Sequence, residues 1–151
     1  MSWKSEIDEL RKRKEKALKL GGEEKVIRQH KSNRYTIRER IALFFDKKSF
    51  EEIGILAGKG SYDKNGNLID FMPSNSIIGQ GLINGFPIVF YGDDFTVRGG
   101  ASDAAIWDKM IAAEKFANEY ELPLVRFIEG TGGGGSVKTL ESQGFSYVPY
   151  N

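Results

Sequence analysis

The chain has 151 residues, enough for one domain with its own core, and its 22 basic and 21 acidic residues give no overall case for nucleic acid. It has no cysteine and a single histidine, His30, which excludes disulfides, a thiol nucleophile and a multi-histidine zinc site. No run approaches the ~20 apolar residues of a membrane span and the N-terminus lacks an apolar signal region, so we expect a cytoplasmic protein without membrane contact.

The N-terminal part is predicted to be a helical arm, residues 1–48. A helix over 3–20 is ended by Gly21-Gly22, and a second covers 23–30. The apolar face of the first would carry Trp3, Ile7, Leu10, Ala17 and Leu20. The basic exterior of the second could attract phosphates, although a solvated face is the more frequent meaning of such charge.

A third helix is predicted after a capping box. Thr36 and Glu39 have the spacing at which the two residues satisfy each other's free N–H groups. The helix would end near Asp46. Its inward side chains would be Ile37, Ile41, Phe44 and Phe45.

Strands and turns are predicted from residue 50 onward. Residues 50–56 could form a strand, and Asn65-Gly66 is typical of a two-residue turn. A second Asn-Gly pair, Asn84-Gly85, separates apolar runs over 77–83 and 86–91, which predicts a β-hairpin.

A β-α-β unit is predicted next. Residues 93–97 extend the apolar layer toward Gly99-Gly100, and Ser102 is a plausible N-cap for a helix reaching Tyr120. The inward face of that helix would carry Ile106, Met110, Ala113, Phe116, Ala117 and Tyr120. The apolar run over 122–128 then predicts a strand reached by a right-handed crossover.

A run of glycines follows that strand. Residues 129–136 read Glu-Gly-Thr-Gly-Gly-Gly-Gly-Ser, and without Cβ atoms their free N–H groups can surround an oxyanion or a phosphate. We expect this run and Gly99-Gly100 to build one site. Beyond Ser136 there is room for a helix over 137–143 and a strand over 145–148, an end that looks cut rather than finished.

Taken together, these segments resemble the N-terminal part of the carboxyltransferase (beta) subunit of biotin-dependent acyl-CoA carboxylases, of the propionyl-CoA and methylcrotonyl-CoA type. The matching order and spacing run from residue 6 to about residue 140. The stretches that carry the resemblance are Gly21 to Glu23, Tyr35 to Ile41 with Asp46, Gly81 to Ile88, Asp93 to Ala101, Lys109, Pro123 and the glycine run.

The resemblance implies an α/β crotonase-like (ClpP/crotonase) spiral of ββα units, here incomplete, with residues 49–151 as the first part of the first domain. It implies an enzyme that moves CO₂ from carboxybiotin to the α-carbon of an acyl-CoA. The implied partners are acyl-CoA, a biotin carboxylase or biotin carrier subunit and further copies of the chain, with no metal. Because no lysine here has the Ala-Met-Lys-Met setting of a biotinylated domain, biotin would arrive on another segment.

The site residues follow from the resemblance. The enolate oxygen needs donors already in place, and the resemblance assigns them to the backbone of Gly133 and Gly134, with Gly132 and Gly135 beside them. The other wall of the acyl pocket would be Gly99, Gly100 and Ala101. Arg38 and Arg40 could meet CoA phosphates, and ion pairs at a helix surface explain these two arginines equally well.

Two departures from the family pattern put acyl specificity in doubt: Gly135 replaces an arginine, and the acidic start of the run is shifted to Glu129.

Three alternatives stay open. Gly130 to Thr139 resembles a P-loop, but Val137 stands where that motif has glycine. The chain could be a non-catalytic piece, or a crotonase-type acyl-CoA hydrolase or hydratase, for which Glu129 would be the nearby acid.

Overall fold

The computed structural model describes residues 3–101, 106–130, 140–141 and 144. The helices predicted over 3–20 and 23–30 are confirmed, and the expected elements over 137–143 and 145–148 fall almost wholly outside the described residues. In chain order the elements are α1 (Lys4–Leu18), α2 (Glu23–Lys31), α3 (Ile37–Phe44), β1 (Glu51–Ile53), β2 (Gly58–Tyr62), β3 (Leu68–Pro73), β4 (Ser76–Ile83), β5 (Phe86–Asp93), the 3₁₀ turn η1 (Arg98–Gly100), α4 (Trp107–Glu119) and β6 (Leu124–Phe127).

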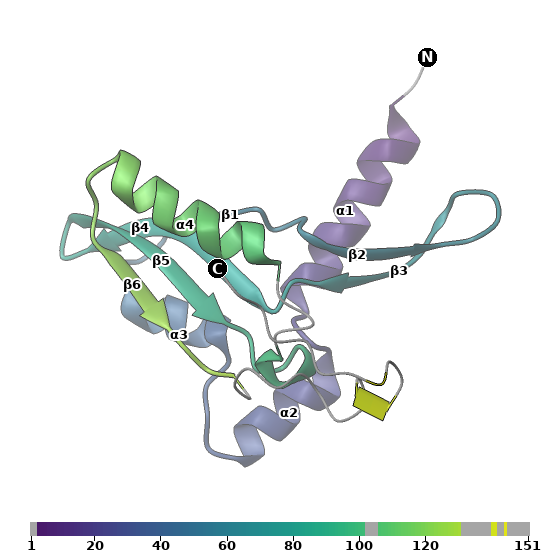
Figure 1. Cartoon of the computed structure of the whole chain (residues 1–151), viewed down its shortest axis with the longest axis horizontal. Coiled ribbons are helices and arrows are strands. Elements are labelled where there is room, and N and C mark those ends of the chain that lie inside the picture. Colours follow the sequence, from purple (N-terminus) through teal and green to yellow (C-terminus); the bar gives the residue numbers. More distant parts are fainter. Residues whose placement is uncertain (1–2, 102–105, 131–139, 142–143, 145–151) are drawn as a thin grey trace.

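Four strands form the main sheet, in the order β1-β4-β5-β6, and β2 with β3 forms a separate hairpin (Figure 1). β1 and β4 are antiparallel, as are β4 and β5, whereas β5 and β6 are parallel and are joined through α4, which is the β-α-β connection expected. The strand expected over 50–56 is shorter, since only Glu51–Ile53 pairs with β4.

The β4–β5 hairpin predicted from Asn84-Gly85 is confirmed, with Ile83 opposite Phe86. Asn84 and Gly85 both have positive φ, at 51° and 81°, as the favoured two-residue turn requires. The Asp46 carboxylate accepts hydrogen bonds from both turn N–H groups, at 3.0 and 2.9 Å. The residue just after α3 is therefore tied to the turn.

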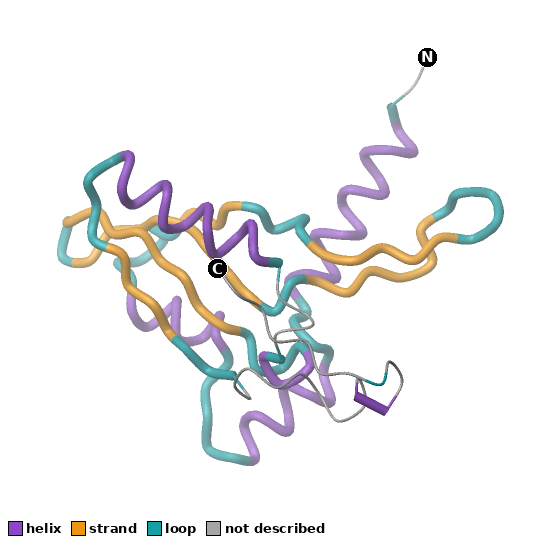
Figure 2. The backbone as a smooth tube through the Cα atoms, viewed as in Figure 1, coloured by secondary structure: helices purple, strands orange, loops and turns teal. Residues whose placement is uncertain are grey.

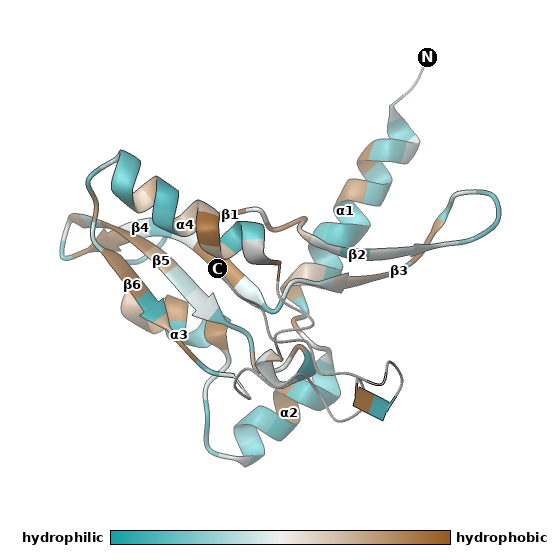
Figure 3. Ribbon diagram, in the orientation of Figure 1, coloured by the Kyte–Doolittle hydropathy of each residue, from teal (hydrophilic) through white to brown (hydrophobic). Residues whose placement is uncertain are grey.

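The main sheet is covered on both faces, by α4 on one and α3 on the other (Figures 1 and 2). Ile77 and Phe90 face α3, while Ile78, Val89 and Tyr91 face α4, as expected from the alternation of side chains along a strand. Apolar residues accordingly concentrate in the central strands, whereas α1 and α2 are largely hydrophilic (Figure 3). No helix in the described part of the chain combines the length and apolarity needed to cross a lipid bilayer.

The third helix begins with the capping box predicted from Thr36 and Glu39. The Glu39 N–H donates to the Thr36 hydroxyl at 3.3 Å, and the Thr36 N–H donates to the Glu39 carboxylate at 2.7 Å. Ile37 and Ile41 are buried against the sheet, so α3 belongs to the same core as the strands.

The predicted apolar face of α1 is mostly not buried. Trp3, Ile7 and Leu10 are exposed, and Ala17 is the buried member. α1 crosses the hairpin and contacts β3 (Figure 1), where Arg13 packs 5.5 Å from the ring centre of Phe71. Because one two-stranded hairpin covers only a narrow part of a helix, the remaining apolar side chains stay in contact with solvent.

The helix expected to start after Ser102 starts later, so that prediction is wrong. α4 begins at Trp107 with Ile106 as its N-cap, and Ser102 lies outside the described residues. η1 ends at Gly100 and Ala101 is extended, and the backbone is again extended at Ile106, directly before the helix.

Candidate functional site

Gly100, which follows β5, lies against Glu129 and Gly130, which follow β6. The two strands are parallel, so their carboxyl ends reach the same edge of the sheet (Figure 1). A Cβ at Gly100 would lie 2.4 Å from the carbonyl oxygen of Glu129 and 2.9 Å from the Cα of Gly130, at a φ of +65°. Only glycine fits there. Ligands of such sheets bind outside the carboxyl ends of the parallel strands, which makes this edge the candidate site.

Buried hydrogen bonds hold the wall formed by residues 94–101. The Asp94 carboxylate accepts from the Thr96 N–H at 2.9 Å and from the Thr96 hydroxyl at 2.6 Å, and the Asn75 side chain donates to the Ala101 carbonyl at 2.8 Å. Burial raises the pKa of Asp94, and the two bonds from Thr96 oppose that shift. With its polar groups paired inside the fold, this wall is pre-organised.

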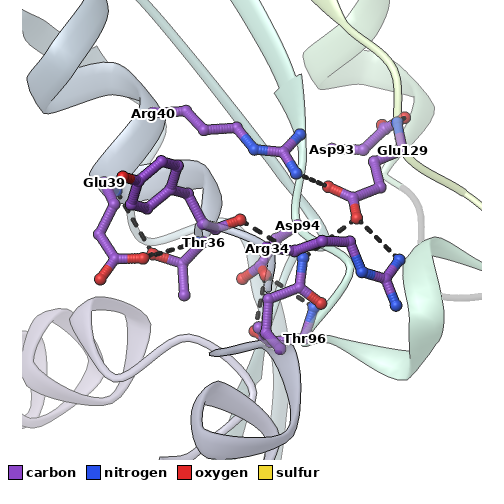
Figure 4. Close-up of polar contacts among 10 residues, drawn as sticks. Arg34, Thr36, Glu39, Arg40, Asp93, Asp94, Thr96 and Glu129 are labelled. Carbon is purple, nitrogen blue, oxygen red and sulfur yellow. Dashed lines mark hydrogen bonds and ion pairs between the residues drawn. The ribbon is translucent and has the colours of Figure 1, made fainter. Parts of the chain in front are cut away.

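Glu129 is the most connected side chain of the site (Figure 4). Its carboxylate accepts from Arg40 at 2.5 Å, from Gln29 at 3.0 Å and from Arg34 at 3.3 Å, and only 15% of the side chain is exposed. Its backbone N–H donates to the Asp93 carboxylate at 3.0 Å. The residue that opens the glycine run is thus held by α2, by Arg34 in the segment after α2, by α3 and by the end of β5.

Asp93 links the ends of the two parallel strands. Besides the Glu129 N–H, it accepts the Tyr91 hydroxyl at 2.8 Å. Burial raises the pKa of Asp93, and the same burial raises the pKa of Tyr91. Because the carboxylate bonds to both β5 and the residue after Ile128, it fixes the spacing of the strand ends.

A cationic pocket of about 430 Å³ lies beside the glycines. The side chains come from α2, from the segment after it and from the loop after β5, and Arg34 stacks 5.0 Å from the ring centre of Phe95. Four basic side chains with hydroxyl and amide donors suit a phosphate or another anion. The lining residues are Lys25, Arg28, Gln29, Ser32, Arg34, Phe95, Thr96, Arg98 and Gly99.

The predicted glycines are placed in part. Gly132, Gly133, Gly134 and Gly135 lie outside the described residues, so their role as oxyanion donors stays a prediction. Gly99 and Gly100 form the turn η1, which lies against Gly130, and Ala101 is buried behind it. Gly130, which precedes the four consecutive glycines, contacts Gly100, and the expectation that the run and Gly99-Gly100 build one site stays a prediction.

The predicted CoA contacts, Arg38 and Arg40, are both engaged in ion pairs. Arg38 donates to the Glu52 carboxylate at 2.8 and 3.3 Å, and Arg40 pairs with Glu129. The ion-pair alternative is therefore present for both, and contact with CoA stays a prediction.

The cationic residues around the pocket are not indicated individually by the sequence. Lys25 and Arg28 belong to the helix with the basic exterior, for which a solvated face is the more frequent interpretation. Arg34 and Arg98 belong to no basic helix face in the sequence. Only the fold brings them together with α2 in the lining of one pocket.

His30 is not part of the pocket lining. Its Nε2 lies 3.0 Å from both oxygens of Glu39 and lowers the pKa of that carboxyl. Within the described ranges, no three His, Cys, Asp or Glu side chains gather as a metal site would require.

Lys109 is a buried cation behind the site. Its ammonium donates to the Ser76 carbonyl at 2.6 Å, and the residue is 7% exposed. Burial lowers the pKa of Lys109 to about 8, with Arg38 acting in the same direction and Glu52 against it. Folding therefore disfavours the charged form.

This shift predicts a pH dependence of stability. Between about pH 8 and the ordinary Lys pKa of 10.5, the unfolded chain binds more protons at Lys109 than the folded one. The free energy of unfolding should therefore gain a contribution that rises with pH in this window. Urea titrations from pH 7 to 10.5 should show the rise relative to Lys109→Met, whereas Lys115→Met, an exposed site on the same helix, should keep it. Identical pH profiles of wild type and Lys109→Met would contradict the prediction.

The chain matches the family model of the carboxyl transferase domain over residues 28–146. It is 32% identical over 133 residues to the carboxyltransferase subunit of propionyl-CoA carboxylase from Haloferax mediterranei, covering 87% of this chain and 26% of that protein. It is 32% identical over 120 residues to the alpha subunit of methylmalonyl-CoA decarboxylase from Propionigenium modestum, covering 79% of this chain and 23% of that protein. The chain thus spans about a quarter of the length of these relatives.

Solved structures show the same fold. Transcarboxylase 12S with methylmalonyl-coenzyme A and methylmalonic acid bound matches with a TM-score of 0.72 at 24% identity, over 95% of this chain and 29% of that chain. The beta subunit of geranyl-CoA carboxylase from P. aeruginosa matches with a TM-score of 0.67 at 24% identity, over 91% and 25%. The expected α/β, crotonase-like fold with a helical N-terminal arm is confirmed.

Proposed function

The chain belongs to the carboxyl transferase domain family, and from this premise we propose that it is the acyl-CoA-binding part of a biotin-dependent acyl-CoA carboxyltransferase. The observation that carries the proposal is the contact of Gly100 with Glu129 and Gly130, directly beside a cationic pocket. The cationic pocket suits phosphates, and the glycines beside it leave their backbone open to a ligand because they carry no Cβ atoms.

The chemistry explains why glycine is used. Loss of a proton from the α-carbon of a thioester, or loss of CO₂ from an α-carboxylate, leaves an enolate with a negative oxygen. Backbone N–H groups that are already aimed at this oxygen stabilise it, and one such donor lowers the barrier by ~3 kcal/mol. In our proposal these donors are Gly133 and Gly134, with Gly132 and Gly135 as neighbours, and Gly99, Gly100 and Ala101 form the opposite wall.

The CoA phosphates are proposed to lie in the cationic pocket rather than at Arg38 and Arg40. The guanidiniums of Arg38 and Arg40 are committed to Glu52 and Glu129. The pocket instead combines several cations with polar donors at the edge where the glycines meet. Charge-assisted hydrogen bonds from arginine suit phosphate oxygens.

The remaining parts of the reaction are assigned to other segments. Biotin supplies the carboxyl group from a carrier on another polypeptide or segment. The carboxyl group could be transferred to an acyl-CoA or removed from one, since both a carboxylase and a decarboxylase are among the relatives. We propose a cytoplasmic homo-oligomer as the working enzyme, with the 151 residues inactive alone.

A crotonase-type hydratase or hydrolase is less favoured. It would use Glu129 as its acid or base, but that carboxylate already accepts from two guanidiniums and an amide. Both of its oxygens are thus already occupied by protein donors.

The proposal is tested by calorimetric titration of the chain with propionyl-CoA, acetyl-CoA and free CoA, with ATP and magnesium as a control. Acyl-CoA should bind to the chain. Gly133→Val should weaken the binding of acyl-CoA and leave the binding of free CoA unchanged. If a cooperatively folded chain bound ATP with magnesium and no acyl-CoA, the proposal would be wrong.

Charge reversal in the pocket should separate its role from general electrostatics. Arg28→Glu should weaken the binding of CoA about tenfold or more, because it places a carboxylate among the cationic side chains that would bind the phosphates. Lys31→Glu makes the same charge change on α2 outside the pocket lining and should have a much smaller effect. Propionyl-pantetheine, which lacks the nucleotide phosphates, should bind both variants alike. Equal weakening of CoA by both variants would argue against a phosphate site at this pocket.

A further inference from the structure

Glu129 joins two features that are otherwise separate, the cationic pocket and the glycine contact. Two of its three side-chain partners, Gln29 and Arg34, also line the pocket. Its own backbone, with that of Gly130, touches Gly100. Glu129 is therefore in contact with both the cationic pocket and the glycine at position 100.

The two arginines on Glu129 differ in what else they can do. Arg40 is 26% exposed and makes the shorter contact, at 2.5 Å, whereas Arg34 is 43% exposed and stacks on Phe95 at the pocket. A guanidinium carries five N–H donors in a planar fork. Arg34 can therefore bind the Glu129 carboxylate and an anion in the pocket at the same time, while Arg40 keeps the carboxylate anchored.

The backbone of Glu129 is held on both sides. The Glu129 N–H is bonded to Asp93 at 3.0 Å, and its carbonyl oxygen faces Gly100, where no Cβ could be accommodated. The Gly100 N–H in turn donates to the Val97 carbonyl at 3.1 Å. Glu129 and Gly130 therefore both lie in close contact with Gly100.

We propose that Glu129 is a positioning residue that couples anion binding in the cationic pocket to the placement of Gly130 against Gly100. An anion that engages Arg34 immobilises Glu129 and thereby the glycine contact. The inference rests on the proposed anion-binding function of the pocket, and it extends that function, since the phosphates of the substrate would then help to order the acyl end of the site. Glu129 acts here through its neighbours and not as an acid or base.

Amide hydrogen exchange by NMR tests the coupling, with inorganic pyrophosphate as the probe because it is too small to span the whole site. In the wild-type chain at constant ionic strength, pyrophosphate should slow exchange of the Glu129 and Gly100 amides about fivefold or more, the low end of typical coupling between sites. The Asn84 and Gly85 amides, held by Asp46 in the distant hairpin turn, should not change.

Two variants make the test decisive. Glu129→Gln should still bind pyrophosphate but lose the slowing at Gly100. Arg34→Lys retains the pocket charge on a half-exposed side chain and lacks the planar fork that serves two partners, so it should give the same loss even if Glu129→Gln folds poorly.

The outcomes are distinguishable. Slowing at Gly100 that persists in both variants would overturn the coupling and leave the anion pocket in place. Failure of pyrophosphate to bind the wild-type chain would overturn both the pocket and the coupling.

Discussion

Replacing Gly100 by alanine is expected to lower the free energy of unfolding by about 3 kcal/mol and to abolish acyl-CoA binding. The residue has a φ of +65°, where an L-residue costs roughly 1–2 kcal/mol. The new methyl group would also lie 2.4 Å from the Glu129 carbonyl oxygen. Backbone atoms must then move, and such overpacking typically costs about 1–3 kcal/mol.

Gly66→Ala is the matched control for Gly100→Ala. Gly66 has a φ of +82°, but a Cβ added there would have no heavy atom within 4 Å, so it carries the conformational cost without the clash. Urea unfolding followed by circular dichroism should give a loss of about 1 kcal/mol for Gly66→Ala. Equal losses in the two variants would mean that Gly100 does not contact the start of the glycine run.

Truncating Phe90 to alanine is expected to destabilise the fold by about 3–5 kcal/mol, the usual range for a buried phenylalanine. Phe90 is fully buried on β5, and its ring centre lies within 6.2 Å of four other phenylalanine rings. Those four rings come from α3, its C-cap, the residue before β1 and the end of β6, and they are Phe44, Phe45, Phe50 and Phe127. The ring thus joins the elements whose ends carry the site.

Phe86→Ala tests whether this effect belongs to the core. Phe86 lies on the same strand but is 72% exposed, so its truncation should cost less than about 1 kcal/mol. Thermal unfolding of both variants checks the difference. A small loss for Phe90→Ala would show that the aromatic cluster is not the centre of the core.

Local structure could be predicted where neighbouring residues alone decide it. The Thr36–Glu39 capping box and the Asn84-Gly85 turn formed as expected, because both depend on side chains and φ values within four residues. The N-cap predicted for α4 is wrong, because the helix has Ile106 rather than Ser102 as its N-cap, and the chemistry of a serine side chain alone does not decide where a helix begins.

The apolar face of α1 shows a different limit. Its periodicity predicts the helix, but periodicity does not say what covers the face, and Trp3 and Leu10 remain exposed beside a narrow hairpin. The division at residue 48 between arm and core stays a prediction, and Ile37 and Ile41 of α3 pack directly on the sheet.

The sequence by itself determined the element types, the turns and the family resemblance, and it led to the expectation that two glycine segments build one site. The element types and turns depend on short-range conformational preference. The resemblance depends on the order and spacing of the matching stretches. Tertiary structure decided which polar and charged groups meet: Gln29 lies 100 positions before Glu129 and Arg34 lies 95, yet both bind its carboxylate. Such pairs are selected by packing of α2 and α3 around the strand ends, since a buried carboxylate must find donors wherever the fold brings them.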